Sequence, residues 1–351
     1  MRPTLVLMLS LLCPPGISAA DHAVVLVYHH VSEDTPPVTS VSPEVFEKHL
    51  QYLEDNEFNV WPLSRIVDYL QQRKLMPENT VAITFDDAFE SVYDEALPRM
   101  QKRGWPFTLF VSSEPIDRGF KNYLSWNKIR KLAAKGVEIA NHSHSHAHLV
   151  RRHEGESKSE WQIRVSRDID QGSRRIEEET GQRHRIFAYP YGEYSPDLQL
   201  LLKQKGYFGI AQQSGAMSHE SDFLALPRFP MSTGYAKMSR LAISVNARAL
   251  PVKGIEFTVR NSTNGAMDQL RFNLKNGAYR IAELACYSAI GGKLQIEDVG
   301  EQTYRLLLAE TQRAGRNKVN CTAPSSEKSG EYFWHSFQWL VKNPDGSWYR
   351  E

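Results

Sequence analysis

Between residues 23 and 235 short apolar runs alternate with helical patterns, and this alternation constrains the fold more than any other feature. The apolar runs cover residues 23–28, 80–85, 106–111, 137–140, 185–189 and 207–211. Helical patterns lie between them, with starts such as Ser42-Pro43-Glu44 and ends at glycines such as Gly104, Gly136 and Gly181. Repeated strand–helix–strand order implies a parallel sheet, open or closed into a barrel.

The pattern changes near Pro251. Short runs without long helices follow at 255–260, 269–274, 279–284, 293–297, 304–308, 318–321 and 332–341, separated by Asn, Gly, Pro and Ser. We therefore expect an α/β domain over residues 21–250 and a small all-β, sandwich-like domain over 251–351.

The last of these runs is rich in aromatic residues: Tyr332, Phe333, Trp334, Phe337 and Trp339. Aromatic surfaces can stack on sugar rings, which would make the second domain glycan-associated. Alternating aromatics can equally fill the core of a sandwich, and this interpretation is favoured.

Charge and hydropathy exclude several classes of protein. The 351 residues include 42 basic and 41 acidic side chains, a formal net charge of +1. This balance excludes an overall polybasic nucleic-acid binder and an acidic disordered chain. After the N-terminus no apolar run approaches the roughly 20 residues of a membrane-spanning helix.

The first 20 residues have the layout of a secretory signal peptide. Arg2 precedes an apolar run over residues 5–12, helix breakers follow, and small residues end at Ala20. We expect cleavage before Asp21 and a periplasmic or secreted protein. The alternative is a buried N-terminal helix, which the prolines would end. Lipidation of Cys13 is rejected, because a small residue normally precedes a lipidated cysteine and here Leu12 does.

Removal of the leader leaves two cysteines, Cys286 and Cys321. An oxidising compartment permits a disulfide between them. The closed loop would be worth roughly 4 kcal/mol in the chain-entropy treatment. We predict that the two are paired, the alternative being two thiols in a core.

Reactive side chains follow several of the predicted strands. These segments are His29-His30, Asp86-Asp87, the tract Asn141-His142-Ser143-His144-Ser145-His146-Ala147-His148, and Tyr189-Pro190-Tyr191-Gly192. Carboxyl ends of parallel strands lie at one edge of a sheet, so we expect these groups to form one site.

The residue types suit a metal hydrolase. Two imidazoles and one carboxylate can hold Zn²⁺, which acidifies water and polarises an acyl oxygen, while a second carboxylate acts as base. Taken singly, Asp-Asp is more often a turn, and the histidine tract could be a solvated loop. The spacing leaves the ligands open, because His142 and His146 share a helix face, as do His144 and His148.

The motifs resemble those of the polysaccharide deacetylases, carbohydrate esterase family 4 with the NodB-homology domain. Thr84-Phe85-Asp86-Asp87 resembles the family's first motif, the segment 142–146 its His-Ser/Thr-x-x-His motif, and the segment 189–192 the end of its third motif. The resemblance implies a distorted (β/α) barrel. It also implies Asp86 as general base, Asp87, His142 and His146 as metal ligands, and the backbone N–H of Tyr191 at the oxyanion site.

Two departures point to one branch of this family. The family's third motif begins with an arginine that holds the base, and here the position is Ala188. The family's late motif, an apolar strand that ends in the general-acid histidine, is missing after Tyr191, because His219 lies in a polar loop. Residues 25–29 have the form of this motif near the N-terminus. This resembles the circularly permuted branch that acts on poly-N-acetylglucosamine of biofilm matrices, which maps the general acid to His29. Arg228 could replace the missing arginine, the alternative being a surface arginine.

The sequence thus predicts an exported, metal-dependent N-deacetylase acting on an N-acetylglucosamine-containing polysaccharide. One alternative is an O-acetyl esterase or another amidase with the same site. Another is a non-catalytic sugar-binding or adhesion protein, against which the intact Asp86, Asp87, His142 and His146 argue.

Overall fold

The computed structural model describes residues 19–309 and 311–350. The predicted leader over residues 1–20 lies outside the described residues, apart from its last two. These two, Ala19–Ala20, form strand β1, which pairs with β6 (Met76–Pro77). Within the described part, no helix combines the length and the apolar character that crossing a membrane requires.

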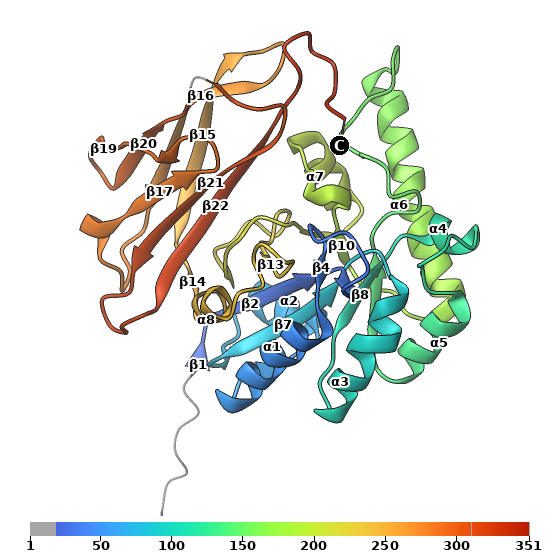
Figure 1. Ribbon diagram of the computed structural model, residues 1–351. Helices are drawn as coiled ribbons and strands as arrows, with labels where there is room; N and C mark the ends of the chain where they lie inside the picture. The colour runs from blue at the N-terminus through green and yellow to red at the C-terminus, as the bar shows by residue number, and fades with distance from the viewer. Residues whose placement is uncertain (1–18, 310, 351) are drawn as a thin grey trace, which may run out of the picture.

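A curled, mainly parallel sheet forms the first part of the molecule (Figure 1). Its strand order is β11-β10-β9-β8-β7-β2-β12, with β13 also beside β2 and β5 beside β7. The bounds are β2 (His22–Tyr28), β5 (Asn59–Val60), β7 (Thr80–Phe85), β8 (Thr108–Val111), β9 (Glu138–Asn141), β10 (Ile186–Ala188), β11 (Phe208–Ile210), β12 (Met217–Ser218) and β13 (Phe229–Pro230). Only β12 runs antiparallel to its neighbour β2 among the pairings of these strands within the described residues.

The segment before β13 brings the two ends of the sheet together. Leu226 N–H donates to Gly209 O at 2.9 Å, and Ala211 N–H donates to Leu226 O at 2.8 Å. A few residues later, Phe229 pairs with Leu26 of β2. The sheet therefore curls toward closure, as in the predicted distorted barrel.

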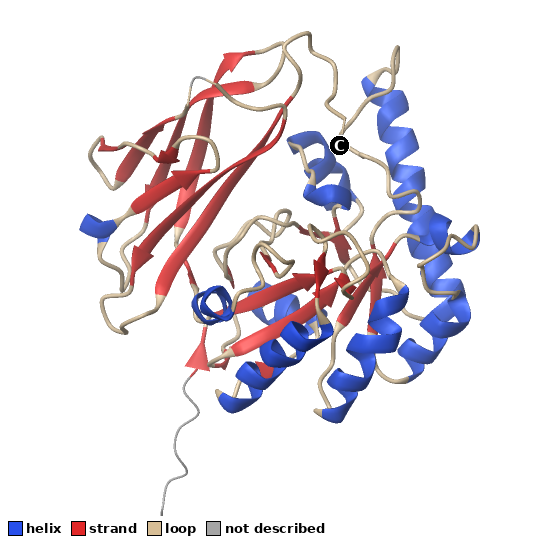
Figure 2. Ribbon diagram, viewed as in Figure 1, coloured by secondary structure: helices blue, strands red, loops and turns tan. Residues whose placement is uncertain are grey.

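Helices cover the outside of this sheet (Figure 2). Helix α1 begins as the sequence predicts, since Ser42 Oγ accepts from Val45 N–H and Pro43 occupies the first turn. The bounds are α1 (Pro43–Asp55), α2 (Leu63–Gln71), a π-helix (Val92–Ala96), α3 (Leu97–Lys102), α4 (Ser113–Asp117), α5 (Trp126–Ala134), α6 (Lys158–Thr180), α7 (Pro196–Gln204) and α8 (Met238–Val245).

The central strands are apolar throughout because both of their faces are buried. In β2, Val24 and Leu26 belong to one hydrophobic cluster, while Ala23 and Val25 belong to another on the opposite face. Helices cover one face and the barrel interior lies on the other, which explains the absence of polar alternation in these runs.

Two mainly antiparallel sheets form the second part of the molecule, the β region (Figure 2). One has the order β15-β16-β20-β19, with β15 (Val252–Asn261), β16 (Ala266–Leu274), β20 (Thr303–Leu307) and β19 (Ile296–Asp298). The other has the order β14-β22-β21-β17-β18, with β14 (Arg248–Ala249), β22 (Tyr332–Val341), β21 (Gly315–Pro324), β17 (Ala285–Ser288) and β18 (Gly292–Lys293). In this second sheet β14 runs parallel to β22.

The predicted disulfide is confirmed. Cys286 of β17 lies directly opposite Cys321 of β21 in the strand register, and the two are bonded. Both are fully buried in a cluster with Leu270, Phe272 and Phe337, so the cross-link lies in the apolar core of the β region.

One predicted strand is wrong. Residues 279–284 contain a 3-10 helix, Ile281–Glu283, and the strand comes after it as β17. The ring of Tyr279 packs against Phe333 at 5.2 Å, and Arg280 pairs with Glu283 across the turn. These contacts stabilise the 3-10 turn in a segment that the apolar run alone had predicted to be a strand.

The aromatic residues of β22 are mainly core residues, as favoured. Phe333, Phe337 and Trp339 belong to the cluster between the two sheets. Trp334 points the other way, into the core of the α/β part, where its ring meets Phe229 at 5.3 Å. The sheet of β21 and β22 is therefore covered on both faces, by the second sheet and by the α/β part.

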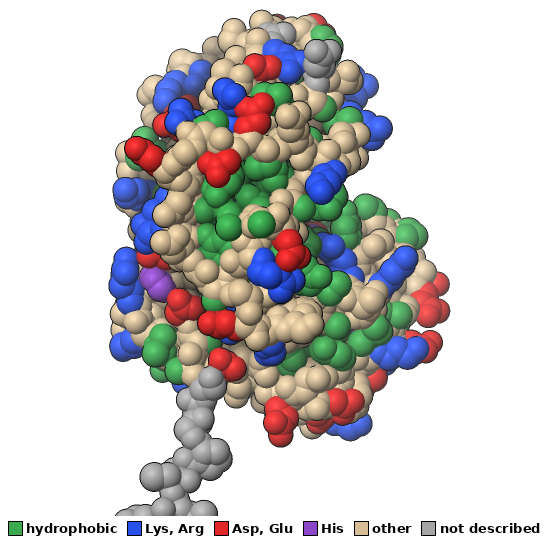
Figure 3. All heavy atoms as spheres, turned by 90° about the vertical axis from the view of Figure 1, so that its left-hand side faces the viewer, with side chains coloured by type: hydrophobic (Ala, Val, Ile, Leu, Met, Phe, Trp, Pro, Cys, Tyr) green, Lys and Arg blue, Asp and Glu red, His purple; other side chains and the backbone are tan. Residues whose placement is uncertain are grey.

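The side of the molecule that carries the β region shows hydrophobic side chains gathered among charged ones (Figure 3). Exposed apolar residues of this region include Ile255, Val259 and Leu307.

Candidate active site

The predicted site residues lie at one edge of the curled sheet. His29 follows β2, Asp86 and Asp87 follow β7, His142 follows β9 and Tyr191 follows β10. Asp86 N–H donates to Tyr28 O at 3.0 Å, which fixes the ends of β2 and β7 side by side.

Two of these residues, Asp87 and His142, form a cluster with His146 that has the donor set of a metal site. One ligand atom each from Asp87, His142 and His146 lies within 4.8 Å of the others. Asp87 Oδ1 is 3.0 Å from His146 Nε2 and 3.4 Å from His142 Nε2. Donors about 2.0–2.1 Å from a tetrahedral Zn²⁺ stand roughly 3.3 Å apart, so the spacing fits such an ion.

The hydrogen bonds around the cluster also fit a divalent ion. His142 Nδ1 lies 2.8 Å from Ala188 O, and a carbonyl only accepts, so the ring proton is on Nδ1 and the Nε2 lone pair faces Asp87. Asp87 Oδ1 is buried, and the Nε2 atoms of His146 and His142 lie against it. Burial raises the pKa of Asp87, but the imidazoles of His146 and His142 lower it further, leaving it well below its ordinary value.

The loop that carries the histidines is held tightly against helix α6. Ser143 and His146 have φ of 73° and 54°, and Ser143 N–H donates to Asn141 Oδ1 at 2.7 Å. Gly172 of α6 permits this approach, because a Cβ there would lie 2.7 Å from Asn141 Oδ1 and 2.8 Å from the Ser143 carbonyl carbon. Left-handed backbone outside glycine costs about 1–3 kcal/mol, which the packing must offset.

Arg228 is not a surface residue. Both it and Asp86 have 0% exposed side chains, and the guanidinium reaches the two carboxylate oxygens at 2.7 and 2.8 Å. Its Nε donates to Ala211 O at 2.9 Å. Burial raises the pKa of Asp86, and the nearby Arg228 and His142 lower it by more, so the carboxylate stays ionised.

The two adjacent histidines after β2 have different surroundings. His29 Nε2 lies 3.9 Å from Asp86 Oδ2, and the side chain is 19% exposed. Burial lowers the pKa of His29, although Asp86 and Asp87 partly oppose this. The ring of His30 instead stacks on Phe89 at 3.7 Å, and burial lowers its pKa to about 4.

Tyr191 occupies a left-handed turn, with φ of 58°. Its ring stacks on His148 at 3.9 Å and lies 4.6 Å from the ring of His146. His148 Nδ1 is 2.9 Å from Glu193 Oε2, and Glu193 also accepts from the Tyr349 hydroxyl. The turn is therefore supported by residues from the C-terminal end of the chain.

Of the histidines in the tract, His142 and His146 converge on Asp87, whereas His144 and His148 do not. His144 lies 2.7 Å from Ser113 Oγ and 2.9 Å from Gln171 Nε2. His219 lies away from the cluster, 3.8 Å from Asp21 Oδ2. The structure thus distinguishes two arrangements that the spacing alone could not.

One polar residue at this edge went unnoticed in the sequence. Gln212 follows β11, and its Nε2 donates to Asp86 Oδ2 at 3.2 Å. The signal was the same as for the other site residues, a polar side chain directly after an apolar run at 207–211.

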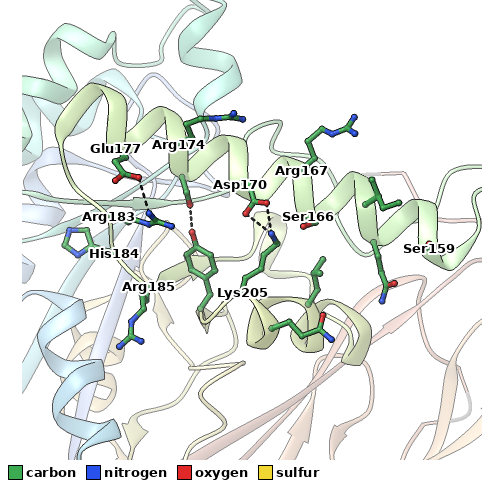
Figure 4. A pocket seen from close by; sticks show the side chains of 16 residues that line it. Ser159, Ser166, Arg167, Asp170, Arg174, Glu177, Arg183, His184, Arg185 and Lys205 are labelled. Atoms are coloured by element: carbon green, nitrogen blue, oxygen red, sulfur yellow. Dashed lines mark hydrogen bonds and ion pairs between the residues drawn. The ribbon is translucent and has the colours of Figure 1, made fainter.

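A groove of about 1530 Å³ lies elsewhere, between α6, α7 and the starts of β10 and β11 (Figure 4). Two ion pairs lie in it, Arg183 with Glu177 and Lys205 with Asp170. Arg183 precedes β10, whereas Tyr191 follows it, so the groove belongs to the opposite edge of the sheet.

Comparison with known proteins relates a segment of the α/β part to a family. Residues 73–210 match the sequence model described as Polysaccharide deacetylase. The poly-beta-1,6-N-acetyl-D-glucosamine N-deacetylase of Staphylococcus epidermidis is 26% identical over 198 residues, which cover 55% of this chain and 68% of that protein.

Solved structures share the fold. IcaB from Ammonifex degensii superposes with a TM-score of 0.55 and 25% identity, covering 62% of this chain and 94% of that one. Streptococcus pyogenes deacetylase PplD in complex with acetate gives a TM-score of 0.57 at 19% identity, covering 64% and 98%. The matched segment, residues 73–210, includes Asp86, Asp87, His142 and His146, and the match identifies it as a polysaccharide deacetylase domain.

Proposed function

We propose that this protein is a metal-dependent polysaccharide N-deacetylase that removes acetyl groups from an N-acetylglucosamine-containing glycan. One observation carries the proposal. A cluster of two histidines and the buried carboxylate of Asp87 lies beside a second carboxylate, Asp86, that Arg228 holds ionised. The identity of the S. epidermidis relative supports the choice of glycan.

Asp87, His142 and His146 would hold the metal. A divalent ion, for which Zn²⁺ has the best-matched ligand preference, supplies Lewis-acid polarisation of the acetyl carbonyl and acidifies water. The fixed tautomer of His142 supports this assignment, since its Nε2 lone pair faces the other donors.

Asp86 is the general base in this proposal. It takes a proton from the attacking water, whose oxygen forms the new bond to the acetyl carbon. The Arg228 guanidinium keeps the carboxylate ionised and fixes its plane, so that no reorientation is needed when the proton arrives. The backbone N–H of Tyr191 is assigned to the developing oxyanion.

His29 delivers a proton to the leaving nitrogen as the carbon–nitrogen bond breaks, releasing acetate and an amine. Because its pKa lies below the ordinary value, the imidazole must first gain a proton inside the site. Asp86 Oδ2, 3.9 Å from His29 Nε2, is placed to pass on the proton that it took from water.

We further propose that residues 21–250 form the deacetylase domain, that residues 251–351 form a separate β-rich domain, and that the protein is exported to the periplasm or secreted. A separate hydrophobic cluster in the β region supports the division. The Cys286–Cys321 bond and the leader pattern support export, because disulfides persist in oxidising compartments.

The function is tested with a panel of substrates. Purified protein is incubated with N-acetylglucosamine oligomers, an O-acetylated polysaccharide and an N-acetylated peptide, and released acetate is measured. We expect acetate from the N-acetylated glycan, loss of release with a chelator and recovery with added Zn²⁺. Release from the O-acetylated polysaccharide alone would instead establish an esterase.

The role of His29 has its own test. His29→Ala should lower kcat on the amide by roughly 10²-fold or more at unchanged metal content, and an activated acetyl ester should suffer much less. His30→Ala is the matched control, because its ring faces Phe89. Equal losses on amide and ester would contradict the general-acid role, and a larger loss for His30→Ala would move it to that residue.

A further inference from the structure

One face of the β region rests on the loops of the candidate active site. Side chains alternate along a strand, so even-numbered residues of β21 and β22 share a face. The register pairs Lys318 with Gln338 on this face. Gln338 Nε2 donates to Gly192 O at 2.8 Å, and Lys318 Nζ donates to Gln212 O at 3.3 Å. The β region therefore contacts both the Tyr191 turn and the segment after β11.

Arg316, on the same face of β21, touches both of these segments. Its Nη1 donates to Gln212 Oε1 at 3.3 Å. The same atom lies against Gly192, where a Cβ would come within 2.6 Å of it. The guanidinium thus sits between the turn that carries Tyr191 and the side chain of Gln212.

Gln212 continues the contact to the carboxylate, since its Nε2 donates to Asp86 Oδ2 at 3.2 Å. The two ends of an amide differ, one accepting and one donating, and an arginine offers only donors. Arg316 therefore requires the amide oxygen on its own side, which leaves the NH₂ group facing Asp86. With the amide turned over, its oxygen would face the carboxylate and repel it.

We propose that Arg316 is a positioning residue for deacetylation, which fixes the amide of Gln212 and through it the carboxylate of Asp86, so that the β region completes the active site. The proposal rests on the proposed function. Asp86 is then held from two directions, by Arg228 of the α/β part and by the Gln212–Arg316 pair. Misplacement of a reacting group by about 1 Å can cost about 10²-fold in rate, so a contact that only positions Asp86 can still change kcat strongly.

The proposal is tested by a double-mutant cycle on the full chain. Arg316→Met should lower kcat on the N-acetylated glycan by roughly 10- to 100-fold and change KM by less than about threefold, because the base and not the sugar is misplaced. Gln212→Met should have a similar effect. In the Gln212→Met background, adding Arg316→Met should cost no more than about a further twofold, because the intermediary is already gone.

Three controls accompany the cycle. Arg316→Lys retains a donor and should recover part of the lost kcat. Arg313→Met changes an exposed arginine three residues earlier and should leave kcat unchanged. Metal content and the thermal unfolding midpoint are measured for every variant, so that unfolded protein is recognised. If Arg316→Met does not fold, the kcat of Gln212→Met still tests the proposal.

The outcomes separate the two proposals. Wild-type kcat in Arg316→Met, or losses that add in the double variant, would overturn the positioning role while the deacetylase function stands. A wild-type protein that releases acetate from no substrate in the panel would overturn the proposed function and this inference with it.

Discussion

The α/β part and the β region place their charged groups in opposite ways. The α/β part buries an ion pair completely, Asp86 with Arg228, at the edge that carries the site. The ion pairs of the β region are partly exposed, as in Arg305 with Glu297, and its interior holds apolar side chains and a disulfide. Buried charges cost stability but are preorganised for reaction, whereas an apolar cross-linked core adds stability and no chemistry.

In this chain the α/β part thus supplies the reactive groups, and the β region supplies a stable, cross-linked core. The contact between the parts is the exception, since it places two basic side chains of β21, Arg316 and Lys318, against the loops of the site. Four changes test how far the separation holds.

Removal of a metal ligand should have the largest effect. We expect His142→Ala to lose both bound metal and activity, because one of three protein donors is gone. His144→Ala is the matched control and should keep the metal, since its ring contacts Ser113 and Gln171 instead. Metal analysis of the purified variants checks this, and the opposite pattern would show that the ligands are wrongly assigned.

Breaking the buried ion pair comes next. Arg228→Met leaves the Asp86 carboxylate buried without its cation, so unfolding should become easier by about 3–5 kcal/mol. Replacing Asp86 by Leu in the same variant removes the charge and should recover stability, though not activity. Denaturant titration measures both, and a loss below about 1 kcal/mol would mean that water reaches the carboxylate.

The disulfide tests the other region. Replacing Cys286 and Cys321 by Ala should lower the free energy of unfolding by roughly 4 kcal/mol, because a loop of 35 residues is no longer closed in the unfolded chain. Metal content of the folded protein should not change. If the metal were lost together with the cross-link, the two parts would be one cooperative unit and the comparison would fail.

The smallest of the four effects should come from Lys318, whose titration should make the free energy of unfolding depend on pH. Burial, together with the charge of Arg316, lowers the pKa of Lys318 to about 7. An unfolded lysine has a pKa of about 10.4, so between these values the unfolded chain binds more protons and folding becomes more favourable as pH rises. The slope approaches about 1.4 kcal/mol per pH unit.

Lys318→Met should lack this rise. Urea titrations of both proteins at pH 7 and pH 9 measure the difference between them, in which other titrating groups cancel. Equal slopes for the two proteins would mean that Lys318 remains solvated and charged at the contact.

Local signals predicted most elements that pack along their whole length. The run at 80–85 became β7 and the run at 332–341 became β22 with the predicted bounds, and Ser42 caps α1 as expected. Where long-range packing decides the conformation, the sequence was insufficient. Residues 279–284 are compact because Tyr279 reaches Phe333, a contact that no local pattern specifies.

The site shows the same limit. Strand ends predicted which segments would meet, and the motif resemblance suggested His142 and His146, which do converge on Asp87. Arg228 and Arg316 could not be placed by local pattern. Both depend on distant segments that fold back. Arg228 reaches Asp86 through the segment that pairs with β11 and β2, and Arg316 reaches Gln212 from one face of β21.

The distance along the chain between Asp86 and its partner bears on how this protein can be divided. The two residues of the ion pair are 142 positions apart, and the family match ends at residue 210, before Arg228 is reached. A fragment trimmed to the match would therefore lack β2, the neighbour of β7 that leads to His29, and would leave Asp86 without its guanidinium. The smallest piece worth expressing must extend past residue 230, and during synthesis on the ribosome the site stays incomplete until that segment has emerged.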